Sequence, residues 1–104
     1  MNTIRPTRSR NIQWYQINEN IILILPNNFF KKHYKHILPV GMIKVYLRNP
    51  ILKLIWLNCD RNHTIDEIYK IVDQKFSKLD ISPAYVRKAV VKLKERGLIL
   101  LKTQ

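Results

Sequence analysis

The spacing of apolar residues changes once along the chain, near residue 49. Before that point apolar and polar residues alternate in short runs, and after it apolar residues recur every three or four positions. The run MIKVYL, residues 42–47, shows the alternation most clearly, with Ile43, Val45 and Leu47 on one face. This pattern predicts a half-buried strand.

Two more strands are expected upstream of it. The runs IQWYQI (residues 12–17) and IILIL (residues 21–25) are joined by the polar link Asn18-Glu19-Asn20. A link this short favours an antiparallel hairpin. Residues 26–41 form a basic, aromatic connection whose structure the pattern leaves open.

Three helices are expected after residue 49, because each predicted start has a capping residue. Asn49 precedes Pro50, and Ser82 precedes Pro83, a residue that suits the first helical position. Thr64 and Glu67 have the spacing of a capping box. Gly97 is expected to end the last helix. The expected buried stripe of the second helix comprises Ile65, Ile68, Ile71, Val72 and Phe76.

The order of elements predicts an α+β fold. Three antiparallel strands precede three helices, and LILL (residues 98–101) reads as a short terminal strand. This order is typical of a winged helix-turn-helix domain. We expect a single domain over residues 12–104, and we expect residues 1–11, which hold Arg5, Arg8 and Arg10 but little apolar mass, to be a flexible basic arm.

The amino-acid composition limits the cellular locations and the classes of partner that are expected for this protein. The 104 residues carry a net charge of +12, which favours a polyanionic partner such as nucleic acid, an acidic peptide or an anionic membrane surface. Cys59 is the single cysteine, so no intrachain disulfide is expected. The longest apolar run is residues 21–25, and the first residues lack a signal-peptide pattern, so no membrane span and a cytoplasmic location are expected.

The stretch IWLNCDRNHTIDEIYKIVDQKF, with VRKAVVKLKERGLI after it, resembles the PqqD-like family. The matching features are Trp56 on a helix, the Cys59-Asp60 turn, the Thr-Ile-x-Glu-Ile start at residues 64–68, and Leu93 followed by residues 97–99. The likeness covers roughly residues 13–101. The family usually has Gly after Cys-Asp, and here we expect Asn62 to supply the left-handed conformation of that turn.

Members of that family recognise precursor peptides of ribosomally made, modified natural products. The resemblance therefore implies a non-catalytic domain that binds a leader peptide and presents it to a modifying enzyme, without a cofactor. The peptide would lie as an extra strand beside residues 42–47, in a groove walled by the third helix. A free strand edge offers unpaired N–H and C=O groups for such binding, but it also allows pairing with a second copy, so monomer and homodimer both stay open.

Helical periodicity divides the third helix into two faces. Val86, Ala89, Val90 and Leu93 fall together and are expected to face the core. Val91 falls among cations on the opposite side, where it either seats an apolar anchor of the peptide or is simply exposed. The expected peptide-binding residues are Met42, Lys44, Tyr46, Ala84, Arg87, Lys88, Val91 and Lys94.

Nucleic acid is the alternative partner. A winged helix would direct Tyr85, Arg87, Lys88 and Lys92 at a DNA major groove, and the arginines of the first eleven residues would reach the minor groove or phosphates. Against this, the exposed helix lacks the Asn and Gln that read bases. The segment SKLD, residues 77–80, is also long for a helix-turn-helix turn.

Metal binding and catalysis have weaker support. His33 and His36, or Cys59 and His63, supply two ligands each where zinc needs about four, and nothing brings the pairs together. Cys59 and His63 lack an oxyanion site, so the turn is interpreted as a hinge between two helices, braced by Asp60. FFKKHYKH, residues 29–36, suits either a solvated loop or a docking segment at a membrane or partner surface.

Overall fold

The computed structural model describes residues 4–26 and 42–103, which belong to two compact units. The helical unit comprises Met1–Ser9 and Asn49–Gln104, and the sheet unit comprises Arg10–Arg48. The sequence predicts one domain from residue 12 onward, whereas the contacts group the first nine residues with the helices. The basic, aromatic connection lies outside the described residues from 27 to 41.

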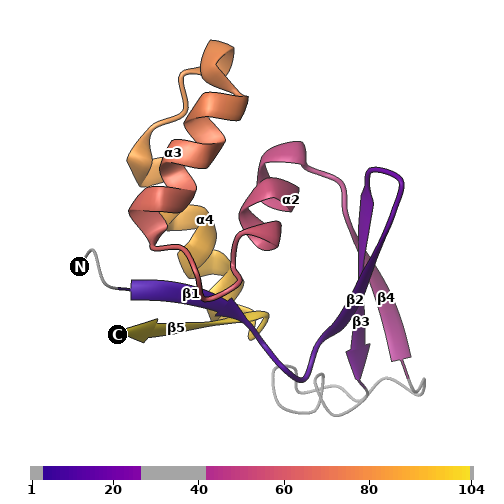
Figure 1. Cartoon of the computed structure of the whole chain (residues 1–104). Coiled ribbons are helices and arrows are strands. Elements are labelled where there is room, and N and C mark those ends of the chain that lie inside the picture. The colour runs from indigo at the N-terminus through magenta and orange to yellow at the C-terminus, as the bar shows by residue number, and fades with distance from the viewer. Residues whose placement is uncertain (1–3, 27–41, 104) are drawn as a thin grey trace. The chain divides into compact units, whose positions relative to one another are not determined.

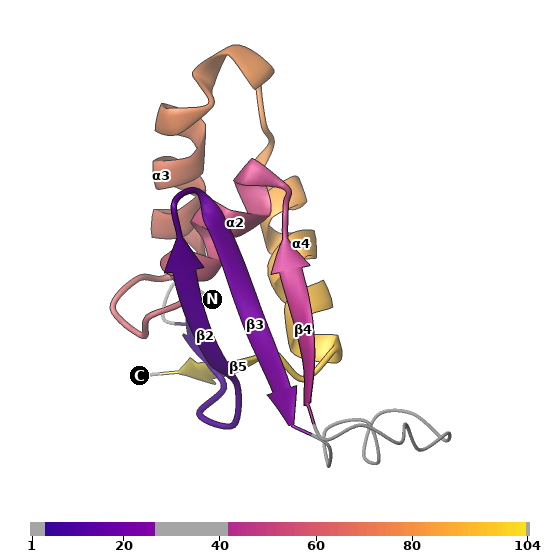
Figure 2. The same cartoon turned by 90° about the vertical axis from the view of Figure 1, so that its right-hand side faces the viewer.

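In its described residues the sheet unit contains three antiparallel strands, with β3 in the middle (Figure 2). They are β2 (Gln13–Ile17), β3 (Asn20–Pro26) and β4 (Met42–Leu47). The hairpin between β2 and β3 is closed by Asn18, whose φ of 55° lies in the left-handed region that asparagine tolerates. The three predicted strands are confirmed, with ends that differ by at most one residue.

The two faces of this sheet differ in burial. Ile21, Leu23 and Leu25 on β3 are buried, and Leu47 lies opposite Ile21 on the same face and is buried as well. The opposite face carries Tyr15, Ile22 and Tyr46 in one row across the strands. Of these three, Ile22 is buried and Tyr46 is half exposed.

The helical unit is built from three helices around an apolar core (Figure 1). They are α2 (Pro50–Leu57), α3 (Ile65–Lys75) and α4 (Pro83–Glu95), and the 3-10 turn η1 (Ser77–Leu79) lies between α3 and α4. On α3, the predicted stripe is only partly covered, since Ile68 and Val72 are buried while its other members are half-buried. The buried side chains of the helices are Ile55, Trp56, Ile68, Val72, Val86, Val90 and Leu93.

The predicted caps explain where these helices begin. The Asn49 side chain accepts the N–H groups of the first turn of α2, at 2.9 and 3.1 Å. At α3 the capping box is complete, because Thr64 Oγ1 accepts the Glu67 N–H at 3.2 Å while the Glu67 carboxylate accepts the Thr64 N–H at 2.7 Å. The Ser82 hydroxyl caps α4 by accepting the Tyr85 N–H at 3.2 Å. These local signals need no tertiary partner, which is why the sequence alone predicts them.

The end of α4 is a Schellman motif. Gly97 has a φ of 77° and donates its N–H to the Lys94 carbonyl, and Leu98 donates to the Leu93 carbonyl. Both bonds satisfy carbonyls that the helix leaves unpaired. The motif turns the chain directly into β5 (Ile99–Thr103), which confirms the predicted terminal strand.

The first residues correct one prediction. Instead of a flexible arm, Ile4–Arg8 forms strand β1, which pairs antiparallel with β5. The two strands lie side by side beneath the helices in Figure 1. Pro6 is fully buried opposite Leu101. The flexible-arm prediction is therefore wrong for residues 4–8.

Pro6, in the middle of β1, is compatible with this pairing because its backbone C=O and nitrogen point away from β5. The Pro6 carbonyl accepts the Arg61 N–H at 3.0 Å, on the side away from β5. In a strand the N–H and C=O of one residue point the same way, so the N–H that proline lacks is not one that β5 would use.

The described residues thus form an α+β architecture with three helices, a three-stranded antiparallel sheet and a two-stranded antiparallel sheet. The predicted fold class is confirmed at this level. In the part of the chain that the structure describes, no helix is long and apolar enough to cross a bilayer.

Candidate functional site

Helix α4 presents most of the residues that the sequence singles out. Val86, Val90 and Leu93 anchor it in the core, as predicted, while Ala89 is only half-buried. The remaining side chains of the helix are exposed. Among these are five of the predicted peptide-binding residues: Ala84, Arg87, Lys88, Val91 and Lys94.

Beside the core face of α4 lies a hollow of about 220 Å³ that we call the α2–α4 hollow. Both helices contribute to it, together with Asn49, the N-cap of α2. Its lining consists of Asn49, Leu52, Tyr85, Lys88, Ala89, Lys92, Leu93 and Arg96. Every one of these residues belongs to the helical unit.

The hollow combines an apolar floor with a positively charged rim. Leu52, Ala89 and Leu93 are its aliphatic members, and Lys88, Lys92 and Arg96 are its cations. The three cations recur at every fourth residue, so they form one row along α4. No acidic side chain is among the lining residues. The chemistry therefore suits an apolar group accompanied by negative charge.

Of the predicted peptide-binding residues of α4, only Lys88 lines the hollow, while Tyr85 and Lys92, expected for the nucleic-acid alternative, line it as well. Val91 is 41% exposed, as its position among cations suggests, but it does not line the hollow. At 100° per residue, Val91 and Ala89 lie on opposite sides of the buried face of α4. Leu52 and Arg96 are not among the residues predicted from the sequence, although the four-residue spacing of Lys88, Lys92 and Arg96 is a signal visible in it.

Strand β4 holds the other predicted binding residues. Lys44 and Tyr46 are exposed on one face, and the buried Leu47 lies on the other. The backbone of Met42 pairs with Pro26, while its side chain lies outside the described part of the chain. Within residues 4–26 and 42–103, β4 has a strand neighbour on one side only, which is β3.

The exposed face of β4 carries an aromatic ring and a cation in contact. The Arg48 guanidinium lies 5.9 Å from the centroid of the Tyr46 ring, within the range of a cation–π interaction. At an exposed position this contact contributes little stability. It holds a positive charge close to the sheet edge.

The turn between α2 and α3 is braced by side chains. Asp60 Oδ1 accepts the Asn62 N–H at 2.9 Å and lies 2.9 Å from His63 Nδ1. Partial burial opposes ionisation of Asp60, but the hydrogen bonds from His63 and Asn62 outweigh it, so its pKa lies below the ordinary value. Arg61, and not Asn62 as expected, takes the left-handed conformation, with a φ of 74°.

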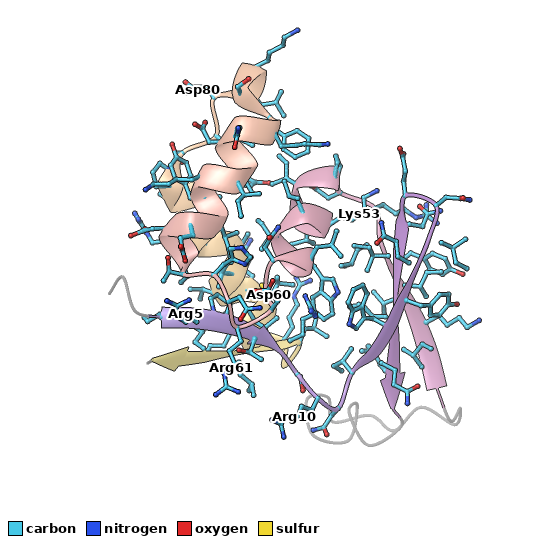
Figure 3. All side chains as sticks on the ribbon, viewed as in Figure 1. Arg5, Arg10, Lys53, Asp60, Arg61 and Asp80 are labelled. Atoms are coloured by element: carbon cyan, nitrogen blue, oxygen red, sulfur yellow. The ribbon has the colours of Figure 1, made fainter. Side chains whose placement is uncertain are left out.

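Strand β1 holds this turn from the side. The Arg8 N–H donates to the Cys59 carbonyl, and the Arg5 guanidinium donates to the Asn62 carbonyl. Figure 3 shows Arg5 on β1 next to the turn that carries Asp60 and Arg61. Arg8 also donates to the carbonyls of the last two residues of α2, at 2.8 and 3.0 Å. These bonds agree with a bracing role for the turn.

Cys59 is fully buried, and this burial raises the pKa of its thiol to about 12. The nearby Arg8 charge lowers the pKa without offsetting burial. The thiol is therefore protonated at neutral pH and lacks the thiolate that nucleophilic attack or metal ligation requires.

The candidate metal ligands cannot be assembled from the described residues. Cys59 and His63 lie in the turn, but His33 and His36 fall in residues 27–41, outside the described part. Within that part, no group of three or more His, Cys, Asp or Glu side chains is placed to hold a metal ion.

Three comparisons with known proteins identified no similar protein. A scan against family models, a search of curated proteins and a search of solved structures all found no match.

Proposed function

We propose that this protein is a non-catalytic winged-helix domain that binds an extended acidic peptide as an added strand on β4. The peptide would be the leader segment of a ribosomal precursor, presented to a modifying enzyme in the manner of the PqqD-like family. The resemblance in residues 13–101 supports the class of partner. Two structural features support binding. One is the edge of β4 in the sheet unit, and the other is the set of cations on α4 in the helical unit.

The edge of β4 is the observation that carries the proposal. β4 is six residues long, has no internal proline, and pairs with β3 in an unbroken register from Ile21↔Leu47 to Pro26↔Met42. Among the described residues its other edge has no backbone partner. A straight edge of this kind supplies alternate N–H and C=O groups to an extended peptide.

The cations of α4 support an acidic peptide. Arg87, Lys88, Lys92 and Lys94 are exposed on this helix, and Glu95 is the one acidic residue within it. Positive charge on this surface speeds the encounter with a negatively charged partner. It does not distinguish a peptide from nucleic acid.

Selection from a random library of 12-residue peptides tests the proposal. We expect enriched acidic peptides, and we expect their binding to slow hydrogen exchange of alternate amides in Met42–Leu47. Methylating one alternate set of peptide nitrogens should abolish binding, because those N–H groups pair with β4. Methylating the other set is the matched control and should be tolerated. Failure to enrich any peptide, or binding without protection of β4, would overturn the proposal.

Nucleic acid binding is the second candidate, and the excess of cations on α4 supports it as well. In this reading, affinity for duplex DNA falls steeply as salt is raised, and a sequence-specific component remains above the non-specific background. The connection between α3 and α4 disfavours DNA binding through a helix-turn-helix. It contains η1 and the left-handed Asp80, so it is longer than the turn of that motif. A gel-shift series over salt, with competitor DNA, separates the two candidates.

A further inference from the structure

The α2–α4 hollow has a size that suits one side chain. Its volume of about 220 Å³ falls below the roughly 300 Å³ at which small-molecule sites begin. It exceeds the roughly 150 Å³ of an apolar cavity that accepts a benzene ring. The aliphatic floor of Leu52, Ala89 and Leu93 can therefore take a single leucine, isoleucine or phenylalanine side chain.

The cation row sets a length scale along this site. Lys88 and Arg96 are separated by about 12 Å along the axis of α4, at 1.5 Å per residue. In an extended peptide, residues four positions apart are separated by about 13 Å, and their side chains point to the same face. The residue midway between them points the same way and lies opposite Ala89 and Leu93.

The three cations are available for a ligand. Among the described residues, none of Lys88, Lys92 and Arg96 has a carboxylate within salt-bridge distance. Lys88 and Arg96 mark the two ends of the row, and Lys92 lies between them. The stem of Lys92 can cover an apolar side chain while its ammonium group stays in water.

We infer that the α2–α4 hollow selects an extended segment of the form acid-x-apolar-x-acid. The apolar side chain fills the hollow over Ala89 and Leu93, and the two carboxylates reach Lys88 and Arg96. This inference rests on the proposed function, because it specifies the sequence that the bound peptide carries. It makes no use of Val91, so it also replaces the anchor position expected from the sequence.

Peptides of one composition and different spacing test the register. Starting from a library-selected binder, the two acidic residues are placed one, two or four positions from the apolar residue on each side. Fluorescence anisotropy should give the tightest binding at two positions. Placement at one position turns both carboxylates away and should weaken binding by about two- to fivefold for each lost contact. Equal affinity for all three spacings would overturn the inference, and so would a preference for four, which marks a helical ligand.

Variants of the protein test the location. Lys88→Gln and Arg96→Gln should each weaken binding by about two- to fivefold, and each should abolish the benefit of one acidic residue only. Lys70→Gln is the matched control, because Lys70 is an exposed cation of α3 that does not line the hollow. Ala89→Leu fills the hollow and should weaken binding about tenfold or more, with thermal unfolding measured to confirm that the variant is folded. Wild-type affinity in folded Ala89→Leu would overturn the inference.

The outcomes separate this inference from the proposed function. Peptides that protect β4 but lack the spacing, or that ignore the hollow variants, overturn the hollow assignment and leave strand addition intact. A selection that enriches no peptide overturns both. Enriched peptides that carry the spacing and lose affinity in Ala89→Leu support both.

Discussion

Among the residues that the structure describes, strands β1 and β4 each pair with one neighbouring strand, yet their other edges differ. The outer edge of β1 is occupied by the turn after α2, through the bonds from Arg8 to Cys59 and from Arg61 to Pro6. A bridge between Thr7 and Asp60 lies between these bonds. The outer edge of β4 has no comparable bond among the described residues.

The sequences of the two strands suggest the opposite arrangement, with β4 as the better enclosed strand. β4 has the regular alternation expected of a strand, whereas β1 reads IRPTR, with a proline in the middle and two arginines. β1 is nevertheless enclosed on both sides, because its backbone groups are satisfied by β5 and by the turn. Enclosure of a strand thus depends on partners that are distant in the sequence. Among the described residues, the regular strand is the one whose outer edge has no backbone partner.

The largest expected effect comes from removing β1. Deletion of residues 1–9 removes the fully buried Pro6, the pairing with β5 and the guanidinium bonds to α2. We expect a loss of about 5 kcal/mol in the free energy of unfolding, a large part of what a small domain has. Urea denaturation followed by circular dichroism measures it. Unchanged stability would show that these residues are an arm after all.

Arg8→Met separates the role of one side chain from that of the strand. The variant keeps the apolar stem but loses the donors to the Trp56 and Leu57 carbonyls. We expect a loss of about 2 kcal/mol, because both bonds are charge-assisted and partly buried. Arg5→Met is the matched control on the same strand, since the Arg5 bond to Asn62 is exposed and should cost less. Equal losses in both variants would contradict the assignment.

The sequence predicts those parts of the fold that depend on neighbouring residues. The caps at Asn49, Thr64 and Ser82, and the turn at Gly97, are local and are all observed. β1 was missed because its partner lies at Ile99–Thr103, at the other end of the chain. The α2–α4 hollow was missed for a similar reason, since its floor requires Leu52 of α2 to face α4. Periodicity in one helix cannot show which flank a second helix leaves open.

Ionisation of Asp60, in the turn that lies against β1, makes the free energy of unfolding depend on pH. Its folded-state pKa lies below the ordinary value of 3.8, so the ionised carboxylate stabilises the folded protein above that pH. This contribution is lost as the pH falls through the lowered pKa. Asp60→Asn should therefore cost up to about 1 kcal/mol at pH 5 and progressively less below pH 3.8.

The measurement is urea denaturation of both proteins between pH 5 and pH 2. Asp80→Asn serves as the control, because Asp80 is exposed after η1 and asparagine accepts its left-handed conformation equally well. A constant difference between wild type and Asp60→Asn over this range would show that ionisation of Asp60 does not stabilise the turn.

The smallest effect on stability, and the most direct test of the open edge, comes from Lys44→Val. Lys44 is exposed in the middle of β4, and a lysine on an edge strand opposes pairing with a second copy. We expect the free energy of unfolding to change by less than about 0.5 kcal/mol, while self-association increases in sedimentation velocity runs. Lys70→Val, which removes an exposed cation from α3, is the matched control for lost charge and should remain as dispersed as wild type. If Lys44→Val associates no more than Lys70→Val, the edge of β4 is not accessible to another strand, and the peptide proposed to bind there has no backbone to pair with.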